Sequence, residues 1–213
     1  MLVPFITVNN TDSYNLIVEG MKNVQENKIS CINWPEEYPS SPNVSFKMAH
    51  NGTHLFLHYF VEENEILAKT EKDNGPVWTD SCVEFFISFN DYPFYYNLES
   101  SCIGKVLFGY RKDRQDVEYG NSVIMDSIRR FPSLGYDNFE KKEGDFKWNL
   151  LLIIPVSSFW KSDIRSLNGM RAKANLYKCG DDLSVPHFLS WQPIKTEKPN
   201  FHMPAFFSEL VFE

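Results

Sequence analysis

The chain has 213 residues, of which 43% are hydrophobic and 23% charged, so it is long enough for one β-sandwich or barrel, or for two small domains, and its composition is not that of a disordered protein. Its net charge is −7 without any basic block, and we therefore expect neither a nucleic acid nor an anionic membrane as partner. No stretch approaches the roughly 18 apolar residues of a membrane span, and the N-terminus lacks the charged start and apolar run of a signal peptide.

The first predicted elements are a strand and a short helical turn within residues 1–28, which we expect to pack on the rest of the chain as an N-terminal extension. A hairpin follows in VSFKMAHNGTHLFLHYFV, residues 44–61, where two alternating runs flank Asn51-Gly52, a dipeptide that favours a type I′ turn. His54 and His58 share one face of this strand about 13 Å apart, too far for a common zinc ion.

Further strands are predicted at 81–89 and 94–111, before a charged and turn-rich stretch at 112–145 that we expect to form a long excursion with one short helix in SVIMDSIRRF. Apolar or alternating runs at 146–156, 169–180, 187–194 and 205–213 predict the remaining strands. This pattern predicts an all-β fold with little helix, an antiparallel β-sandwich of the jelly-roll-like or immunoglobulin-like two-sheet kind, in which residues 1–213 form a single domain.

Motifs for catalysis are missing from the sequence. It has no G-x-S-x-G, P-loop, dinucleotide-binding or H-E-x-x-H pattern, so we expect a protein that is not an enzyme. The four cysteines, at positions 31, 82, 102 and 179, form no C-x-x-C pair. Cys82 and Cys102 lie in apolar strand patterns and are expected to be small buried side chains, and a disulfide between two of the four stays open.

Features that favour ligand binding are more specific. Trp78 follows a Gly-Pro turn, and Glu84 lies six residues later inside an apolar strand. Sugar sites combine an aromatic platform for the C–H face of the ring with carboxylate, amide or guanidinium groups for the hydroxyls. Glu84 is therefore either a ligand-binding residue beside Trp78 or a solvent-facing glutamate on a half-buried strand. Tyr95, Asn97 and Glu99 share one strand face by the period of two.

Four segments together, GPVWTDSCVEFFISF, YYNLESSCIGKVL, LYKCGDDLSVPHFLSWQPI and PNFHMPAFFSELVFE, resemble the family 9 carbohydrate-binding modules, in particular the cellulose- and xylan-binding-like members of gut-type bacteria. The resemblance runs from about Trp34 to the C-terminus. It implies an antiparallel β-sandwich that holds a terminal sugar between two tryptophans, here Trp78 and Trp191. Glu84 would accept hydrogen bonds from the hydroxyls, and Asn97 would be the amide partner.

Three departures from the family pattern stand out. Tyr95 occupies the position where binders of the family have an arginine, Ser81 replaces the second acid after the tryptophan, and the final motif has Ala205 and Ser208 where Glu and Gly are common. Tyr95 is retained as a candidate ligand-binding residue, with a phenol in place of a cationic donor.

The resemblance implies a mono- or oligosaccharide partner from a plant-type or host glycan. It also implies structural calcium, for which the sequence assigns no ligands. Two alternatives stay open besides a sandwich used only for protein contacts: an accessory domain of a glycoside hydrolase, and a b-type haem electron-transfer sandwich. The haem alternative would draw its axial ligands from Met48, His187, His202 and Met203. As the sequence stands we expect a cytoplasmic protein, or a periplasmic or secreted one if a leader has been removed.

Overall fold

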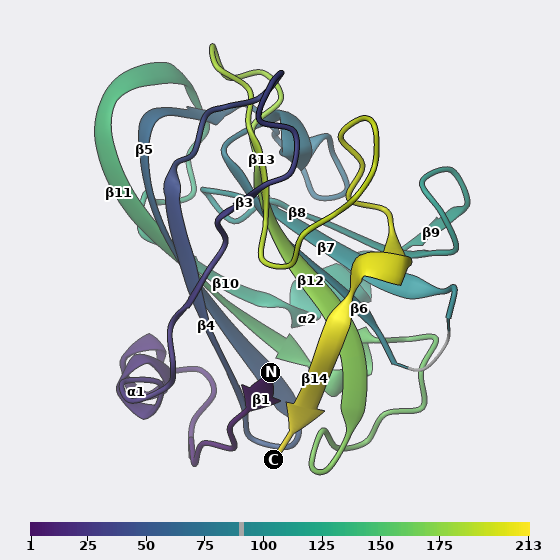
Figure 1. Ribbon diagram of the computed structural model, residues 1–213. Helices are drawn as coiled ribbons and strands as arrows, with labels where there is room; N and C mark the ends of the chain where they lie inside the picture. The colour runs from purple at the N-terminus through teal and green to yellow at the C-terminus, as the bar shows by residue number, and fades with distance from the viewer. Residues whose placement is uncertain (90–91) are drawn as a thin grey trace.

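The computed structural model describes residues 1–89 and 92–213, which form two β-sheets packed face to face (Figure 1). Within these residues the larger sheet has nine strands: β1 (Leu2–Val3), β3 (Cys31–Ile32), β6 (Cys82–Ser88), β7 (Tyr95–Ser101), β8 (Val106–Arg111), β9 (Val117–Tyr119), β12 (Arg171–Cys179), β13 (Phe188–Ser190) and β14 (Ser208–Phe212). The smaller sheet has five: β2 (Asn27–Lys28), β4 (Asn43–His50), β5 (His54–Ala68), β10 (Arg129–Pro132) and β11 (Phe139–Pro155). The helical elements are α1 (Tyr14–Gly20), α2 (Ser122–Ser127) and the 3₁₀ turns η1 (Val77–Thr79), η2 (Val156–Ser158) and η3 (Pro204–Phe206).

The strand order confirms the predicted antiparallel sandwich. The larger sheet follows β1-β14-β12-β6-β7-β8-β9, with β13 paired to β12 and β3 paired to β13, and the smaller sheet follows β10-β11-β5-β4-β2. The pair β1–β14 is parallel, and the central pairs β12–β6, β6–β7 and β7–β8 are antiparallel. Among the described residues no helix has the length and apolar character needed to cross a membrane.

The core lies between the two sheets. Alternate residues of β6, β7 and β8, such as Phe85, Leu98 and Phe108, are buried with Leu57 and Leu152 of the smaller sheet. Each fully buried side chain of this size stabilises the fold by about 1.5–3 kcal/mol. The period of two in these strands therefore assigns one set of residues to the core and leaves the other set on the opposite face of the larger sheet.

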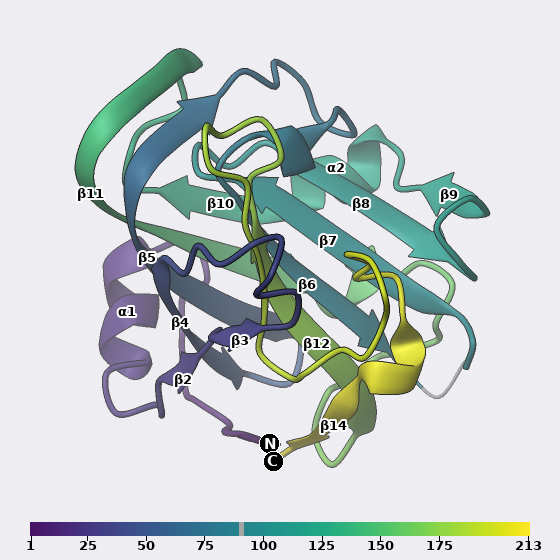
Figure 2. The same cartoon turned by 45° about the horizontal axis from the view of Figure 1, so that its top comes forward.

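Residues 1–28 lie against both sheets. β1 extends the edge of the larger sheet beside β14, where the Val211 amide donates to the Met1 carbonyl at 2.9 Å, so the two chain ends are neighbours (Figure 1). Helix α1 buries Ile17 against Phe56 and Leu151 on the outside of the smaller sheet (Figure 2).

The β4–β5 hairpin is present, but its turn is not the predicted type I′. Gly52 has a φ of +89°, whereas Asn51 is not among the residues with positive φ. Instead, the Asn51 side chain accepts hydrogen bonds from the amides of Thr53 and His54 at 3.2 and 2.8 Å. A side-chain oxygen that folds back on the following amides is an alternative way for Asn to form a turn.

The stretch 112–145 is more regular than the sequence predicted. It contains β9, α2 and β10, and β11 already begins at Phe139 and pairs with β5 as far as Ala68. Helix α2 is capped by the Asn121 side chain, which accepts from the Ile124 amide at 3.1 Å. The first half of β11 is exposed, polar and interrupted by register shifts, and these properties explain why its sequence pattern did not indicate a strand.

Two long segments, residues 30–42 and 180–207, cover the face of the larger sheet that points away from the smaller one, called the outer face from here on (Figure 2). They are joined by the Trp34 indole, which donates to the Thr196 carbonyl at 2.9 Å. Beneath them lies a second apolar cluster, which includes Phe86, Tyr177 and Phe201. Because of this cover, β6 and β7 are buried on both faces, and a polar side chain on the outer face is enclosed rather than solvent-facing.

Candidate functional site

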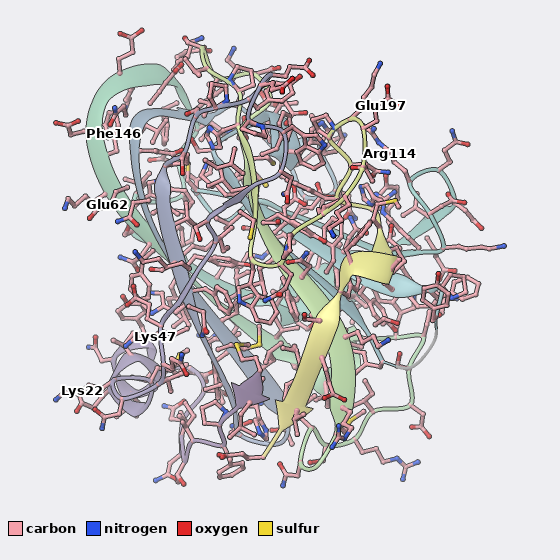
Figure 3. The ribbon with its side chains drawn as sticks, viewed as in Figure 1. Lys22, Lys47, Glu62, Arg114, Phe146 and Glu197 are labelled. Carbon is pink, nitrogen blue, oxygen red and sulfur yellow. The ribbon has the colours of Figure 1, made fainter. Side chains whose placement is uncertain are left out.

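Two cavities compete as the functional site. One, of about 1030 Å³, lies between the paired strands β5 and β11 and the segments 40–43 and 183–187, and the other, of about 440 Å³, lies over the outer face. They open on different sides of the molecule: Glu62 and Phe146 line the first and Arg114 lines the second (Figure 3).

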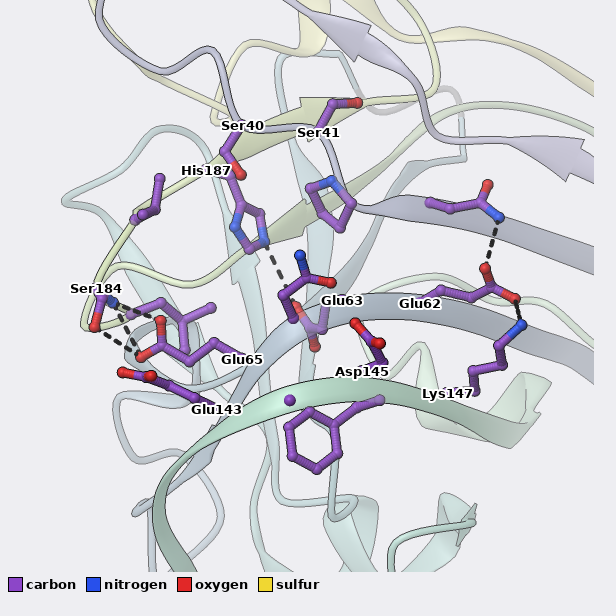
Figure 4. A pocket seen from close by; sticks show the side chains of 17 residues that line it. Ser40, Ser41, Glu62, Glu63, Glu65, Glu143, Asp145, Lys147, Ser184 and His187 are labelled. Atoms are coloured by element: carbon purple, nitrogen blue, oxygen red, sulfur yellow. Dashed lines mark hydrogen bonds and ion pairs between the residues drawn. The ribbon is translucent and has the colours of Figure 1, made fainter.

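The polar groups of the larger cavity are mostly engaged with one another (Figure 4). Glu62 pairs with Lys147 at 2.7 Å, and Glu65 accepts hydrogen bonds from the amide and hydroxyl of Ser184, both at 3.0 Å. Its aromatic lining within the described residues consists of Phe146 and the imidazole of His187. A cavity in which Glu62, Glu63 and Glu65 are already paired and that has few flat surfaces is a poor sugar site, so we take the smaller one, the outer-face pocket, as the candidate site.

The floor of the outer-face pocket carries two carboxylates on neighbouring strands. Glu84 of β6 and Glu99 of β7 are directly opposite in the antiparallel register, and both line the pocket although they are only 3% and 4% exposed. Directly opposed side chains in such a pair have Cβ atoms about 4.5–5.5 Å apart. Asp181, which also lines the pocket, is the second residue after β12, and its backbone amide donates to the Trp78 carbonyl at 3.2 Å.

Burial controls the protonation of these acids. It raises the pKa of Glu84 well above its usual range, and the neighbouring thiol of Cys179 and the charge of Glu99 raise it further. Burial also raises the pKa of Glu99 to about 7, although the hydrogen bond from Asn97 and the charge of Arg111 act in the opposite direction. The pKa of Asp181 rises to about 6, mainly through burial and then through the charge of Asp182. Near neutral pH the floor therefore offers both donating and accepting carboxyl groups.

An arginine that the sequence analysis missed completes the floor. Arg111 of β8 donates through Nε to the Asn97 side-chain oxygen at 2.7 Å, and the Asn97 amide donates to Glu99 at 2.7 Å. Gly109 lies opposite Asn97 in the β7–β8 register, and a Cβ there would come within 2.7 Å of the Asn97 oxygen. This glycine leaves the space in which the guanidinium and the amide meet. The sequence signal that could have identified Arg111 is the period of two, which puts Gly109 and Arg111 on the same face of β8.

Aromatic rings line the pocket above this floor. Trp78, on η1, is 37% exposed, and Tyr38 and Phe188 pack edge to face with ring centroids 4.7 Å apart. Tyr119 also lines the pocket and lies 5.8 Å from the Arg111 guanidinium, measured to its ring centroid. The pocket thus combines flat apolar surfaces with a charged and hydrogen-bonding floor.

The five predicted site residues occupy three different places. Trp78 and Glu84 line the pocket. Tyr95 and Asn97 are fully buried behind its floor, where the Tyr95 hydroxyl lies 2.9 Å from Nδ1 of His202. Both therefore contact residues that line the pocket, His202 in one case and Glu99 and Arg111 in the other.

The structure does not bring Trp191 to Trp78. The Trp191 indole packs edge-on against Phe46 of β4, with centroids 5.8 Å apart, beside the core between the sheets. Strand periodicity is the reason: Leu189 and Trp191 point toward the core, while Phe188, one residue before Leu189, faces the pocket. The second stacking position that the resemblance implied for Trp191 is thus lined by other aromatic residues.

Calcium does not fit the cluster of metal-ligating side chains that the described residues contain. In this part of the chain the cluster of three or more such groups is Cys82, Glu84 and Cys179, which offers two sulfur atoms, whereas calcium takes six to eight oxygen ligands. The residues proposed for haem are also far from forming one site. Met48 lies in the core, His187 hydrogen-bonds Lys178, and His202 lines the outer-face pocket.

Comparison with known proteins identifies the family of this chain. The sequence model described as Carbohydrate-binding family 9 matches residues 14–212. The chain belongs to carbohydrate-binding family 9. A proposed carbohydrate-binding protein from Bacteroides uniformis is 37% identical, with a TM-score of 0.96 over 100% of this chain and 98% of that one.

Two further family 9 structures show the same fold at lower identity. A family 9 module from Caldicellulosiruptor kristjanssonii in complex with glucose is 13% identical, with a TM-score of 0.61 over 100% of this chain and 95% of that one. A family 9 module from the same organism in complex with cellotriose is 13% identical, with a TM-score of 0.62 over 100% of this chain and 93% of that one. No curated protein is significantly similar to this chain in sequence. Family 9 domains are non-catalytic, in agreement with the lack of catalytic motifs, and the haem alternative is not favoured.

Proposed function

We propose that this family 9 domain binds the terminal sugar of a glycan in the outer-face pocket, without catalysing its hydrolysis. The observation that carries the proposal is the juxtaposition of Trp78 and the aromatic lining with the buried acids Glu84 and Glu99 and with Arg111. The pocket volume of about 440 Å³ is in the range of small-molecule sites. Related modules were solved with glucose and cellotriose, so glucose-type sugars are the first ligands to test.

Each part of the site has its own role in this proposal. Trp78 offers its exposed indole face to the C–H face of the sugar ring. Glu84 accepts from or donates to a hydroxyl, according to its protonation state, and Arg111 donates to another. Asn97 orients Glu99 and Arg111 from behind the floor, and Tyr95 orients His202, so these two act by positioning.

The test is isothermal titration calorimetry with glucose, cellotriose and xylo-oligosaccharides on the wild type and on Trp78→Ala. We expect saturable binding of at least one of these sugars and at least a tenfold loss in the variant, which is about 1.4 kcal/mol. Trp191→Phe is the matched control, because its indole packs on Phe46 and should leave the affinity unchanged.

Two results would contradict the proposal. One is the absence of heat with every sugar in protein shown by circular dichroism to be folded. The other is equal affinity of the wild type and Trp78→Ala. Incubation with cellulose and xylan should release no reducing sugar, and release that depends on Glu84 or Glu99 would instead favour the hydrolase alternative.

A further inference from the structure

A pair of free cysteines lies at the inner end of the pocket, beside Glu84. Cys82 of β6 and Cys179 of β12 are directly opposite in the antiparallel register, and neither forms a disulfide. Glu84 is two residues after Cys82, so the strand period puts all three side chains on the outer face. The two sulfur atoms and a carboxylate oxygen of Glu84 lie within 4.8 Å of one another.

The three groups lie close together, and a hydrogen bond joins two of them. The Cys179 thiol donates to the Glu84 carboxylate at 3.1 Å, and the Cys82 sulfur lies across the strand pair within 4.8 Å of both groups. All three residues are at most 3% exposed. Three acidic groups therefore converge in a buried site, and a cation bound there would replace the protons that they carry.

The donor atoms select the class of cation. Two thiolates with a carboxylate suit a soft or borderline ion such as zinc or cadmium, and they suit magnesium and calcium poorly. With Zn–S bonds of about 2.3 Å, two sulfurs on one tetrahedral zinc lie about 3.8 Å apart. The sulfur–sulfur separation therefore needs to contract by no more than about 1 Å to reach that geometry, which side-chain rotation can supply.

The position of the cluster gives access to it and leaves one coordination place free. Cys179 and Glu84 both line the outer-face pocket, whereas Cys82 lies behind them. An ion bound by three protein groups here would face the pocket with its fourth position, as zinc does in sites that keep an exchangeable ligand. Arg111 lines the same pocket and would offset the net negative charge of a zinc ion held by three anionic groups.

We propose that Cys82, Cys179 and Glu84 form a binding site for a thiophilic divalent cation, zinc in chemical class, with its open coordination position directed into the outer-face pocket. Because thiols must lose their protons to coordinate, binding releases protons and weakens as the pH falls. This site does not depend on sugar binding. The two functions share Glu84, however, so the bound ion would lower the affinity of any sugar that uses this carboxylate.

Cadmium is the optical probe for this site, since cadmium–thiolate charge transfer adds an ultraviolet band on the short-wavelength side of the tryptophan absorption. The band is read as the difference between the spectra with and without cadmium, and cadmium bound by oxygen ligands does not produce it. Reduced protein titrated with cadmium should develop this band and saturate at about one ion per chain. Zinc should then displace cadmium and remove the band. The band should be lost in Cys82→Ser and in Cys179→Ser, and Glu84→Gln should weaken binding at least tenfold.

The chain offers matched controls for the thiols. Cys102 is buried in the core between the sheets with its thiol near the Leu67 carbonyl, and Cys31 lies near the Trp191 carbonyl. Cys102→Ser and Cys31→Ser should therefore keep the cadmium band. A band that survives in folded Cys179→Ser but disappears in Cys31→Ser or Cys102→Ser would overturn the assignment.

Folding of the variants is not a condition for the test. If Cys82→Ser fails to fold, cadmium NMR of the wild type reports the ligands directly, because the shift increases with the number of bound sulfurs. A shift typical of two sulfurs supports the site, and a shift typical of oxygen ligands overturns it. Absence of the band in reduced, folded wild-type protein overturns it as well, whatever the sugar titrations give.

Discussion

Two buried glutamates of this molecule, Glu63 and Glu84, differ in what surrounds them, and the difference separates structure from function. Glu63, on β5, pairs with the fully buried Lys178 at 2.8 Å and accepts from the Trp148 indole at 2.7 Å. Glu84 accepts from the thiol of Cys179 and lies opposite another acid, Glu99.

Strand β12 separates the two environments, because its neighbouring residues Lys178 and Cys179 point to opposite faces of the larger sheet. Lys178 points from β12 into the core, where it also donates to His187 at 2.8 Å, while its neighbour Cys179 points to the outer-face pocket. Burial, and then the charge of Lys178, lowers the pKa of His187 to about 2, so its imidazole stays neutral and accepts a hydrogen bond from the lysine ammonium. A buried acid with a complete set of partners holds two sheets together, whereas a buried acid without a cationic partner is available to a ligand.

The largest effect is expected for Glu63→Gln, which tests whether Glu63 is structural. The substitution leaves the Lys178 ammonium buried opposite a neutral amide, and removing one partner of a buried ion pair costs about 3–5 kcal/mol. We expect a loss of this size in the free energy of unfolding from urea denaturation, with sugar affinity unchanged in the folded fraction. Glu62→Gln on the same strand is the control, since Glu62 is half exposed and its pairing with Lys147 is a surface interaction. A loss below about 1 kcal/mol for Glu63→Gln would mean that the pair is dispensable.

Glu84→Gln should show the reverse pattern. Glutamine keeps the shape but replaces one carboxyl oxygen by an NH₂ group, which leaves a sugar hydroxyl without its partner. An unsatisfied buried hydrogen-bonding group costs about 1–3 kcal/mol, so we expect sugar affinity to fall about ten- to a hundredfold by calorimetry. Stability at neutral pH should be unchanged or higher, because burial raises the pKa of Glu84 and its charged form is unfavourable in the fold. Unchanged affinity together with a large loss of stability would assign Glu84 to the scaffold.

The two glutamates also show how far the sequence could lead. Strand alternation was sufficient to predict the sandwich, and the motif around Trp78 was sufficient to predict that Glu84 lies beside it. The sequence gives no sign of the Glu63–Lys178 pair, since the contact joins two sheets and its partners are 115 positions apart in the chain, that is, 178 minus 63. Long-range pairing of this kind leaves no local pattern in one sequence.

The site residues that were missed have a different cause. Arg111 lies in the segment YRKDR, whose charges resemble a solvated edge, and only the register of β8 with β7 places its guanidinium on Asn97. Trp191 was assigned to the pocket by the family resemblance, yet the alternation of β13, continued by one residue, turns it toward Phe46. A position in a motif says little about side-chain direction, and periodicity applied to β13 would have favoured Phe188.

Gly109→Ala tests the Arg111–Asn97–Glu99 connection without altering a charge. The new methyl group would lie 2.7 Å from the Asn97 oxygen and 2.8 Å from a Val117 methyl on the edge strand β9, so both must shift. Overpacking of this kind costs about 1–3 kcal/mol. We expect Gly109→Ala to lower the sugar affinity of the wild type several-fold. The same substitution made in Asn97→Ala should have little further effect, because the double variant lacks the colliding oxygen. Additive losses in the two backgrounds would mean that Gly109 acts independently of Asn97.

The smallest expected effect is on the pH dependence of folding stability, through Glu99. Burial, only partly opposed by Asn97 and Arg111, raises the pKa of Glu99 to about 7 in the folded protein. As the pH rises from about 4.3, the usual pKa of a glutamate, toward 7, the unfolded chain releases this proton while the folded chain retains it, so the contribution of Glu99 to stability is complete below this window and is lost across it. Glu99→Gln removes the titration and should become more stable relative to the wild type as the pH rises from 4 to 8. In Glu62 the pKa is lowered by Lys147 and Asn43, so Glu62→Gln should show a smaller trend of opposite sign. Urea denaturation of the three proteins at pH 4, 6 and 8 measures these differences, and parallel stability curves for Glu99→Gln and the wild type would show that Glu99 is ionised in the fold as freely as in the unfolded chain.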